Sequence, residues 1–479
     1  MSRRISRYGA LALLILPGAA ATMSALSAVR RPVDDPDVFW IAAAGRELLE
    51  GGALLRENFF SFSAPHTSWV MHEWLLGAPY AWGLAHFGAG FFGLVAALVV
   101  VSLTALLLFA TPGEAQAKLV AAAFYLPLFG VHLVSARPMV LALLPAAAML
   151  GLAFSTRFGR TQLILAPLLS LLWVNLHGSF PLGPVFLLVA ALDARRDRRL
   201  RLWATLLSAL TLLLQPHGLA LFELVLEYLG AGTGGADVAR ARLLEFQPLF
   251  GAGARFVSPT AFAGLALLTL VALWLLARRR AFARVGLFAA TGVMATLHAR
   301  HADLAGLVGA MLLIPAALAG VRWRAARNVS TARARALVLL PALALCVSAL
   351  WAGPQVDDSL GGSALPRLLA DLPEGAHLYT PFALGGRAEW LASGRGVRVF
   401  YDSRNDCYPA EVARLAFDLE DDRLTPDEAL AALRAAGTTH LVLRRDSPLA
   451  RALGDAYAVR GAWALYAMPR GAEPRSRGP

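Results

Sequence analysis

Long apolar runs decide what this chain can fold into. Runs of roughly 16 to 25 mostly apolar residues recur from Tyr8 to Trp351, and such a run can cross about 30 Å of hydrocarbon. The 479 residues are 57% hydrophobic and only 16% charged, with a mean hydropathy of +0.57. A water-soluble protein of this size could not bury so much apolar surface. The sequence therefore predicts a mainly α-helical, polytopic membrane protein.

The apolar runs divide into about 11 expected transmembrane helices. Their approximate bounds are residues 8–29, 84–110, 117–134, 138–155, 162–176, 179–193, 202–215, 258–277, 284–299, 302–320 and 335–352. The first run could also be a signal peptide, because arginines precede it and small residues follow it. We favour a retained helix, since residues 11–29 are long enough to span a bilayer.

Arginine clusters predict the orientation. They occupy alternate connections between the apolar runs, at 157–160, 195–201, 278–284 and 322–335, which is the positive-inside pattern of cytoplasmic loops. The net charge of +12 is therefore no sign of nucleic-acid binding. With the N-terminus in the cytoplasm, the outer segments are 30–83, 135–137, 177–178, 216–257, 298–301 and 353–479. All ten histidines fall on that outer side.

The last part of the chain differs in character from the rest. We divide the chain into a transmembrane domain, 1–352, which includes the outer loop 30–83, and a small extracytoplasmic α/β domain, 353–479. In the second domain, segments 377–380, 397–401, 439–443 and 462–467 read as strands. Residues 426–436 read as a helix with Thr425 as its N-cap. The only cysteines, Cys346 and Cys407, have neither disulfide nor metal-site spacing.

The outer loop 30–83 holds paired carboxylates. A short helix fits residues 38–50, with Asp37 as N-cap and Gly51-Gly52 as its end. Asp35 and Asp37 could supply a general base for an acceptor hydroxyl, or hold a divalent cation such as Mg²⁺ or Mn²⁺ beside a phosphate leaving group. The alternative is that Asp37 only caps the helix and its acidic neighbours are solvated.

Two further sets of residues have both a functional and a structural interpretation. His72-Glu73 could bind phosphate, or His72 a metal, but Trp69 and Trp74 could also make this an interfacial anchor. Arg137 lies at the outer face against the charge bias of the other loops, so we expect it to have a partner. That partner is either a phosphate or a carboxylate.

Helix ends supply the remaining candidates. The segments Asn175-Leu176-His177-Gly178 and Gln215-Pro216-His217-Gly218 each end an apolar run with a polar residue, a histidine and a glycine. Helix termination explains the glycines but not the two imidazoles. His298 and His301 flank Arg300, yet zinc would need a third ligand that the sequence does not assign. We take Asn175, His177, His217, Arg300 and His301 as candidate phosphate-binding residues.

Several short motifs, in order along nearly the whole chain, carry a resemblance to a known family. They are Asp35-Pro36-Asp37 with Trp40 and Gly45-Arg46, Phe60-Ser61-Phe62-Ser63, His72-Glu73-Trp74-Leu75, Arg137-Pro138, Asn175-Leu176-His177-Gly178 and the segment Phe400 to Asp406. With these the chain resembles bacterial membrane glycosyltransferases of the GT-C superfamily, which is related to protein O-mannosyltransferases and to lipid A aminoarabinose transferases. One departure is Ile41, where the family often has a histidine.

The resemblance implies transfer of a sugar from a polyprenyl-phosphate carrier, with inversion, at the outer face of the bacterial cytoplasmic membrane. Asp35 or Asp37 would be the base, and Arg137, His177 and His72 would hold the carrier phosphate. The expected partners are a lipid-linked donor, membrane lipids and a glycan, lipid or protein acceptor. The main alternative is a non-catalytic membrane component of a cell-envelope assembly complex. A transporter fits less well, because its ionisable groups would lie near the bilayer midplane.

Overall fold

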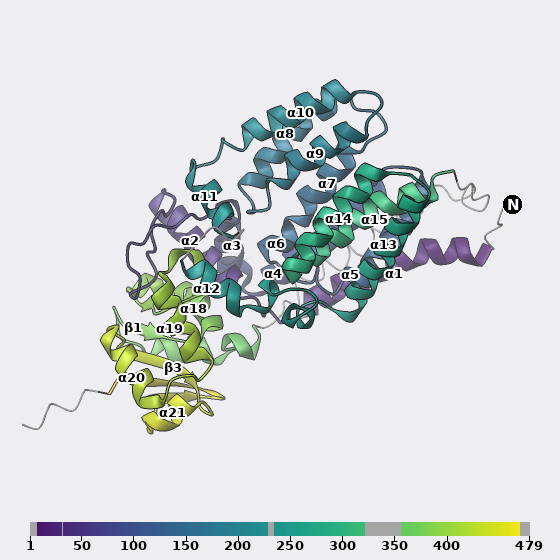
Figure 1. Cartoon of the computed structure of the whole chain (residues 1–479). Coiled ribbons are helices and arrows are strands. Elements are labelled where there is room, and N and C mark those ends of the chain that lie inside the picture. Colours follow the sequence, from purple (N-terminus) through teal and green to yellow (C-terminus); the bar gives the residue numbers. More distant parts are fainter. Residues whose placement is uncertain (1–6, 31, 229–233, 321–355, 470–479) are drawn as a thin grey trace, which may run out of the picture.

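The computed structural model describes residues 7–30, 32–228, 234–320 and 356–469. An elongated body of helices carries a smaller α/β unit at one end, formed by the C-terminal residues (Figure 1). The helices of the body are α1 (Arg7–Arg30), α4 (Gly90–Phe109), α5 (Ala115–Phe129), α6 (Pro138–Leu141), α7 (Leu143–Ala153), α8 (Arg160–Val174), α9 (Leu182–Asp193), α10 (Arg198–Thr211), α13 (Pro259–Ala277), α14 (Phe282–Leu297) and α15 (Ala302–Leu318).

Each expected helix that falls on described residues has a counterpart, with bounds that differ by a few residues. The helix expected at 335–352 lies outside the described residues. By length and composition, only three described helices could cross a membrane by themselves, namely Gly90–Phe109, Pro259–Ala277 and Ala299–Leu318. Five shorter apolar helices accompany them. The expected count of about 11 spans is therefore not confirmed.

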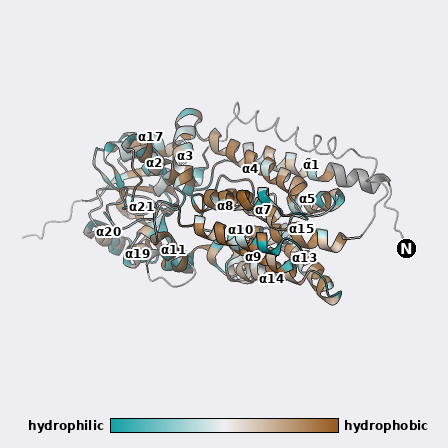
Figure 2. Ribbon diagram, turned by 90° about the horizontal axis from the view of Figure 1, so that it is seen from above, coloured by the Kyte–Doolittle hydropathy of each residue, from teal (hydrophilic) through white to brown (hydrophobic). Residues whose placement is uncertain are grey.

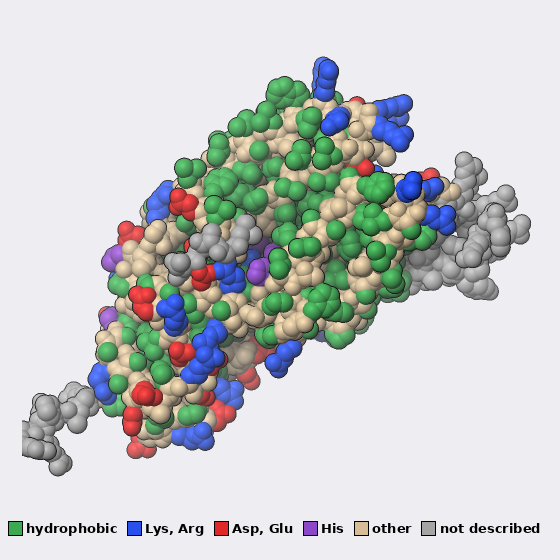
Figure 3. Space-filling view, viewed as in Figure 1, with side chains coloured by type: hydrophobic (Ala, Val, Ile, Leu, Met, Phe, Trp, Pro, Cys, Tyr) green, Lys and Arg blue, Asp and Glu red, His purple; other side chains and the backbone are tan. Residues whose placement is uncertain are grey.

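The surface of the helical body is apolar. Large hydrophobic side chains stand exposed on its helices, such as Ile164 on α8, Leu206 on α10 and Leu270 on α13. Figure 3 shows hydrophobic side chains along one face of the body, and the ribbon in Figure 2 shows hydrophobic residues along its helices, with more hydrophilic residues in the C-terminal unit. Soluble proteins rarely expose so large an apolar area, whereas lipid-facing helices do so routinely. The surface agrees with a location in a membrane.

The C-terminal unit is built around one mixed sheet. Its strand order is β2-β1-β3-β5-β4, with β1 parallel to β2 and β3, and β5 antiparallel to β3 and β4. The strands are β1 (His377–Tyr379), β2 (Arg398–Val399), β3 (His440–Arg444), β4 (Ala458–Arg460) and β5 (Trp463–Ala467). The helices are α17 (Ala364–Ala370), α18 (Gly385–Ala392), α19 (Ala410–Glu420), α20 (Pro426–Ala435) and α21 (Pro448–Leu453).

The sequence located the main parts of this sheet. The four expected strands are present, whereas β4 was not expected. Thr425 is confirmed as the N-cap of α20: its hydroxyl accepts from the Glu428 N–H, and the Glu428 carboxylate accepts from the Thr425 N–H. This reciprocal pairing satisfies two backbone donors at the start of the helix. The expected domain boundary at 352/353 lies outside the described residues.

The segment 30–83, which we expect at the outer face and call the outer segment, contains α2 (Asp37–Gly51) and most of α3 (Trp74–Phe87). Gly52 ends α2 with φ of +67°, as expected. The prediction of Asp37 as N-cap was wrong, because Pro36 occupies that position and Asp37 is the first helical residue. The capping contact comes from Asp35, whose carboxylate accepts from the Asp37 N–H at 2.9 Å.

The outer segment and the C-terminal unit share one hydrophobic core. Buried Phe60 and Trp69 of the segment cluster with Leu378 and Tyr401 of the unit, whereas a second core lies within the helical body. The hydroxyls of Ser61 and Ser63 donate to the Phe400 carbonyl, and Ser61 forms a parallel bridge with Val399. The segment thus extends the sheet edge at β2.

The outer connection between α10 and α13 contains short helices. These are α11 (Ala220–Leu226), α12 (Gly235–Arg242), η2 (Leu244–Phe246) and η3 (Ala252–Arg255), and the turn η4 (Ala299–His301) follows α14. α12 packs against α19 of the C-terminal unit. Gly235 allows this close approach, because a Cβ there would lie only 2.5 Å from the Asn405 carbonyl oxygen. The connection therefore runs between the helical body and the C-terminal unit.

Candidate active site

Three carboxylates surround the guanidinium of Arg137. Its Nε lies 2.9 Å from Asp35, one terminal nitrogen lies 3.3 Å from Asp37, and the other lies 2.7 Å from Glu245. Arg137 directly precedes Pro138 at the start of α6, so its backbone is held in an extended conformation. The side chains are largely enclosed, with exposed fractions of 25% for Arg137 and 11% for Asp35. The structure therefore gives Arg137 carboxylate partners, one of the two alternatives.

Segments far apart in the chain supply this group. Asp35 and Asp37 stand at the start of α2, Arg137 follows α5, and Glu245 lies in η2. The Trp40 indole N–H donates to Asp37 at 3.2 Å, which fixes the free side of that carboxylate. The sequence predicted the two aspartates and the arginine. It missed Glu245, whose segment carries no recognisable motif.

Burial and charge oppose each other in this group. Burial raises the pKa of Asp35 to about 7 against the lowering effect of Arg137, and it also raises the pKa of Asp37. A hydroxyl contact from Ser403 lowers the pKa of Asp37 in part. For Glu245 the two arginines Arg137 and Arg300 outweigh burial, so its pKa is lowered. The site thus pairs one firmly ionised carboxylate with two that take up protons more readily.

His72, Glu73, His177 and Asp406 form a second polar group. The His72 ring lies 3.4 Å from the Glu73 carboxylate and 6.5 Å, between ring centroids, from His177. Burial disfavours the charged form of His72, but Glu73 outweighs it and raises the pKa to about 9. Burial and nearby cations, Arg300 first, hold the pKa of His177 well below its usual range. At neutral pH this gives one cationic and one neutral imidazole.

Asp406 belongs to this second group through its charge. Burial raises its pKa to about 6, and the His72 cation lowers it in part. The residue comes from the C-terminal unit, in the segment Phe400 to Asp406 that supports the family resemblance. Sequence reasoning assigned it no role, although the motif marked its segment.

Arg300 links the two groups. Its guanidinium lies 3.9 Å from the second oxygen of Glu245 and 4.5 Å from the centroid of the Phe246 ring. His301 lies next to it in η4, with its ring 6.3 Å from that of His298. Arg300 is therefore less tightly paired than Arg137, because its contact with Glu245 is longer.

Asn175 lines a groove beside the site, and His217 directly follows two other lining residues, Gln215 and Pro216. The Asn175 side chain accepts from the Trp74 indole N–H at 2.8 Å, and His217 donates to the Met71 carbonyl at 3.0 Å. The groove has a volume of about 630 Å³ and is mostly apolar. It is lined by Trp74 and Leu75, by Leu168, Leu171, Leu172 and Asn175, and by Leu213, Leu214, Gln215 and Pro216.

The residues named as metal ligands do not gather around a common point. Asp35 and Asp37 face Arg137, whereas His72 faces Glu73. Within the described ranges, no group of three or more His, Cys, Asp or Glu side chains has an arrangement that could hold a metal ion. A Mg²⁺ or Mn²⁺ ion held by Asp35 and Asp37 would therefore have to displace the Arg137 guanidinium.

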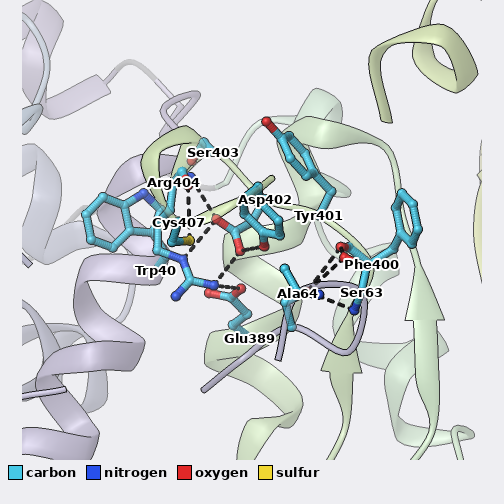
Figure 4. A network of polar contacts seen from close by, with 12 residues as sticks. Trp40, Ser63, Ala64, Glu389, Phe400, Tyr401, Asp402, Ser403, Arg404 and Cys407 are labelled. Atoms are coloured by element: carbon cyan, nitrogen blue, oxygen red, sulfur yellow. Dashed lines mark hydrogen bonds and ion pairs between the residues drawn. The ribbon is translucent and has the colours of Figure 1, made fainter. Parts of the chain in front are cut away.

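A buried ionic network supports the site from the C-terminal unit (Figure 4). The fully buried Arg404 side chain donates to Asp402 and Glu389, each at 2.9 Å, and lies over the Trp69 ring at 4.7 Å. Tyr408 also donates to Asp402. Burial raises the pKa of Asp402, but Arg404 outweighs it and lowers that pKa to about 2. The network fixes the backbone that carries Ser403 and Asp406.

Comparison with known proteins identifies the fold. No family model and no curated protein sequence matches the chain. One similar solved structure is the archaeal oligosaccharyltransferase AglB from Archaeoglobus fulgidus in complex with an inhibitory peptide and a dolichol-phosphate. It is 13% identical with a TM-score of 0.50, and the match covers 91% of this chain and 69% of that chain.

A second structure of the Archaeoglobus fulgidus enzyme, tethered with an acceptor peptide, matches with the same identity and coverage and a TM-score of 0.51. At this identity the likeness shows the fold alone. The chain has the fold of this archaeal oligosaccharyltransferase. Membership of the GT-C superfamily and the expected bacterial relatives stay predictions.

Proposed function

We propose that this protein transfers a sugar from a polyprenyl-phosphate donor to an acceptor hydroxyl, with inversion, at the outer face of a bacterial cytoplasmic membrane. The observation that carries the proposal is the convergence of Asp35, Asp37, Arg137 and Glu245 in one enclosed group. A fold shared with AglB supports the same class of reaction. The acceptor, whether glycan, lipid or protein, is left open.

Asp37 is our first candidate for the general base, and Asp35 is the second. Asp37 is the more exposed of the two, at 21% against 11%. Asp35 also caps α2 through the Asp37 N–H, which suits a positioning role. A base with a raised pKa accepts a proton readily near neutral pH, so the burial of both carboxylates favours this chemistry.

In this proposal, Arg300 and His72 stabilise the phosphate that leaves with the lipid. Arg137 is already paired with three carboxylates, whereas the ion pair of Arg300 with Glu245 is longer, at 3.9 Å. His72 is cationic at neutral pH, and His177 stands beside it as a neutral hydrogen-bonding group. Cations placed where negative charge develops lower the barrier to reaction.

The apolar groove provides a place for the donor lipid. Its walls are mostly leucine side chains of α8 and of the segment that follows α10, and it reaches Trp74 and Asn175 beside the site. A lipid tail in this groove would keep the phosphate near His177. The structure of AglB in complex with a dolichol-phosphate is consistent with a lipid-linked donor.

Single substitutions test the proposed base. We expect Asp37→Asn to lower transfer of labelled sugar from polyprenyl-phosphate donors by about 100-fold or more, because a general base contributes about that much. Asp35→Asn should have a smaller effect, and Asp34→Asn, at an exposed neighbouring position, should have none. Full activity in both D35N and D37N would remove the proposed base. The non-catalytic alternative would be favoured if both aspartate variants kept the cellular function of the protein and only removal of residues 353–479 abolished it.

A further inference from the structure

A buried cluster of three carboxylates requires a positive charge to offset the repulsion among them. Asp35, Asp37 and Glu245 come from segments that are distant in sequence, and each is at least three-quarters buried. Like charges held this close would repel one another. Proteins commonly solve this problem with a divalent cation, because carboxylate oxygens are its preferred ligands. Here the centre of the group is a side chain of the protein itself.

The geometry suits a guanidinium better than a point charge. Each carboxylate contacts a different nitrogen of Arg137, at distances of 2.7, 2.9 and 3.3 Å. The oxygens are therefore spread around a planar group. A divalent cation would need them gathered around one point at about 2.0 to 2.6 Å. The planar fork of arginine matches carboxylate edges in a way that a spherical ion does not.

The position of Arg137 is fixed by the chain. Pro138 restricts its backbone, and the Arg137 N–H donates to the Ser135 hydroxyl at 3.2 Å. The nearby carboxylates outweigh burial and raise the pKa of Arg137 well above its ordinary value, so it stays charged throughout the physiological range. Unlike a bound metal ion, the Arg137 cation cannot be removed by a chelator or replaced by another ion.

We propose that Arg137 is a built-in cation that takes the place of a divalent metal ion at this site. The wild-type protein would then organise Asp35 and Asp37 without Mg²⁺ or Mn²⁺. Removal of the guanidinium would leave three uncompensated carboxylates, which could then close around a divalent cation and form a metal site. This inference concerns the residues of the proposed function, but metal binding can be measured without any transfer assay, so the two can fail separately.

The test uses the purified full-length protein in detergent and Mn²⁺ alone as the probe, with bound Mn²⁺ counted by electron paramagnetic resonance. We expect Arg137→Ala to bind one Mn²⁺ per chain at least about tenfold more tightly than wild type does. Arg137→Lys is the matched control, because it keeps a positive charge and should show no gain. Adding Glu245→Gln to Arg137→Ala should abolish most of the gain.

Two results would overturn the proposal. One is a wild-type protein that binds one Mn²⁺ per chain and loses it on Glu245→Gln, because metal and guanidinium would then coexist. The other is a folded Arg137→Ala protein without tighter Mn²⁺ binding. If Arg137→Ala cannot be purified, Arg137→Gln takes its place, since its amide keeps a hydrogen-bonding group there. For this variant we expect Mn²⁺ to raise the melting temperature, and no rise would count against the proposal.

Discussion

At the scale of single residues, Glu245 acts on several charged groups of the site. Its carboxylate contacts Arg137 directly and Arg300 at longer range, and its charge raises the pKa of both Asp35 and Asp37. A base acts only when ionised, and burial raises the pKa of Asp37, the first candidate, so the acid limb of the kcat/KM profile should lie above the ordinary carboxyl value of 3.8. Glu245→Gln should lower the pKa of both aspartates and shift this acid limb by about one pH unit to lower pH.

The pH profile of kcat/KM measures this effect. Glu50→Gln is the control, because Glu50 is exposed and lies at the opposite end of α2 from Asp37. An unchanged acid limb in Glu245→Gln would contradict the prediction.

The pH dependence of folding stability should also reflect the raised pKa of Asp35. The folded pKa of Asp35 exceeds its ordinary value of 3.8, so the folded state binds more protons between about pH 4 and pH 7. Its contribution to stability therefore falls as pH rises through that window.

The sequence could identify part of the site but not its assembly. Asp35, Asp37 and Arg137 were marked by residue type and by their place at the outer ends of apolar runs. Glu245 was missed because it lies in an irregular connection, where one glutamate looks like any solvated residue. Arg137 has carboxylate partners, and which carboxylates these are depends on long-range packing that no local pattern encodes.

Among the structural elements, the contact between α2 and α3 sets the geometry of the outer segment. The two helices cross at Gly45 and Gly77, where a Cβ on Gly45 would lie 1.9 Å from the Gly77 carbonyl oxygen. No rotamer change can relieve a clash with backbone. Gly45→Ala should therefore force the helices apart and destabilise the protein by about 1 to 3 kcal/mol, the usual cost of overpacking.

Thermal unfolding in detergent, together with the transfer rate, measures this prediction. Gly51→Ala is the matched control in the same helix, since a Cβ there meets nothing within 4 Å and its φ is not positive. We expect Gly45→Ala to lower both the melting temperature and the transfer rate, and Gly51→Ala to lower neither. Equal behaviour of the two variants would show that the crossing does not set the geometry.

Element prediction succeeded where one local rule was sufficient. Apolar length located α13 and α15, and the N-cap residue Thr425 located α20. It failed for most of α3, because residues 74–83 were assigned to a loop and residues 84–87 to the next helix. The strand β4 was missed for a similar reason, since its three residues are defined by pairing with β5.

In the whole molecule, the C-terminal unit and the outer segments form one assembly. They share a hydrophobic core, and α12 rests on α19. The sequence indicated an α/β unit at the end of the chain, but not that the first outer segment would extend its sheet. That contact joins residues more than 300 positions apart, so only the fold can reveal it. The C-terminal unit thus positions groups of the site as well as covering it.

Arg242 tests this coupling. It lies at the end of α12, just before Glu245, and its guanidinium reaches Asp418 at 3.1 Å and Asp421 at 2.7 Å. Both carboxylates are partly exposed, so Arg242→Ala should cost only about 0.2 to 1 kcal/mol of stability per pair. The released connection should nonetheless hold Glu245 less firmly. We expect faster amide hydrogen exchange over residues 235–247 and slower transfer.

Arg423 provides the matched control, because it pairs with the same two carboxylates from within the C-terminal unit. Arg423→Ala removes comparable ion pairs but leaves α12 attached, so exchange over 235–247 and transfer should both stay at the wild-type level. The contrast separates coupling from a general loss of surface charge. If both variants changed exchange and transfer equally, the carboxylates would matter only for their charge. If neither did, α12 would be held by packing around Gly235, and the C-terminal unit would position Glu245 without the ion pairs.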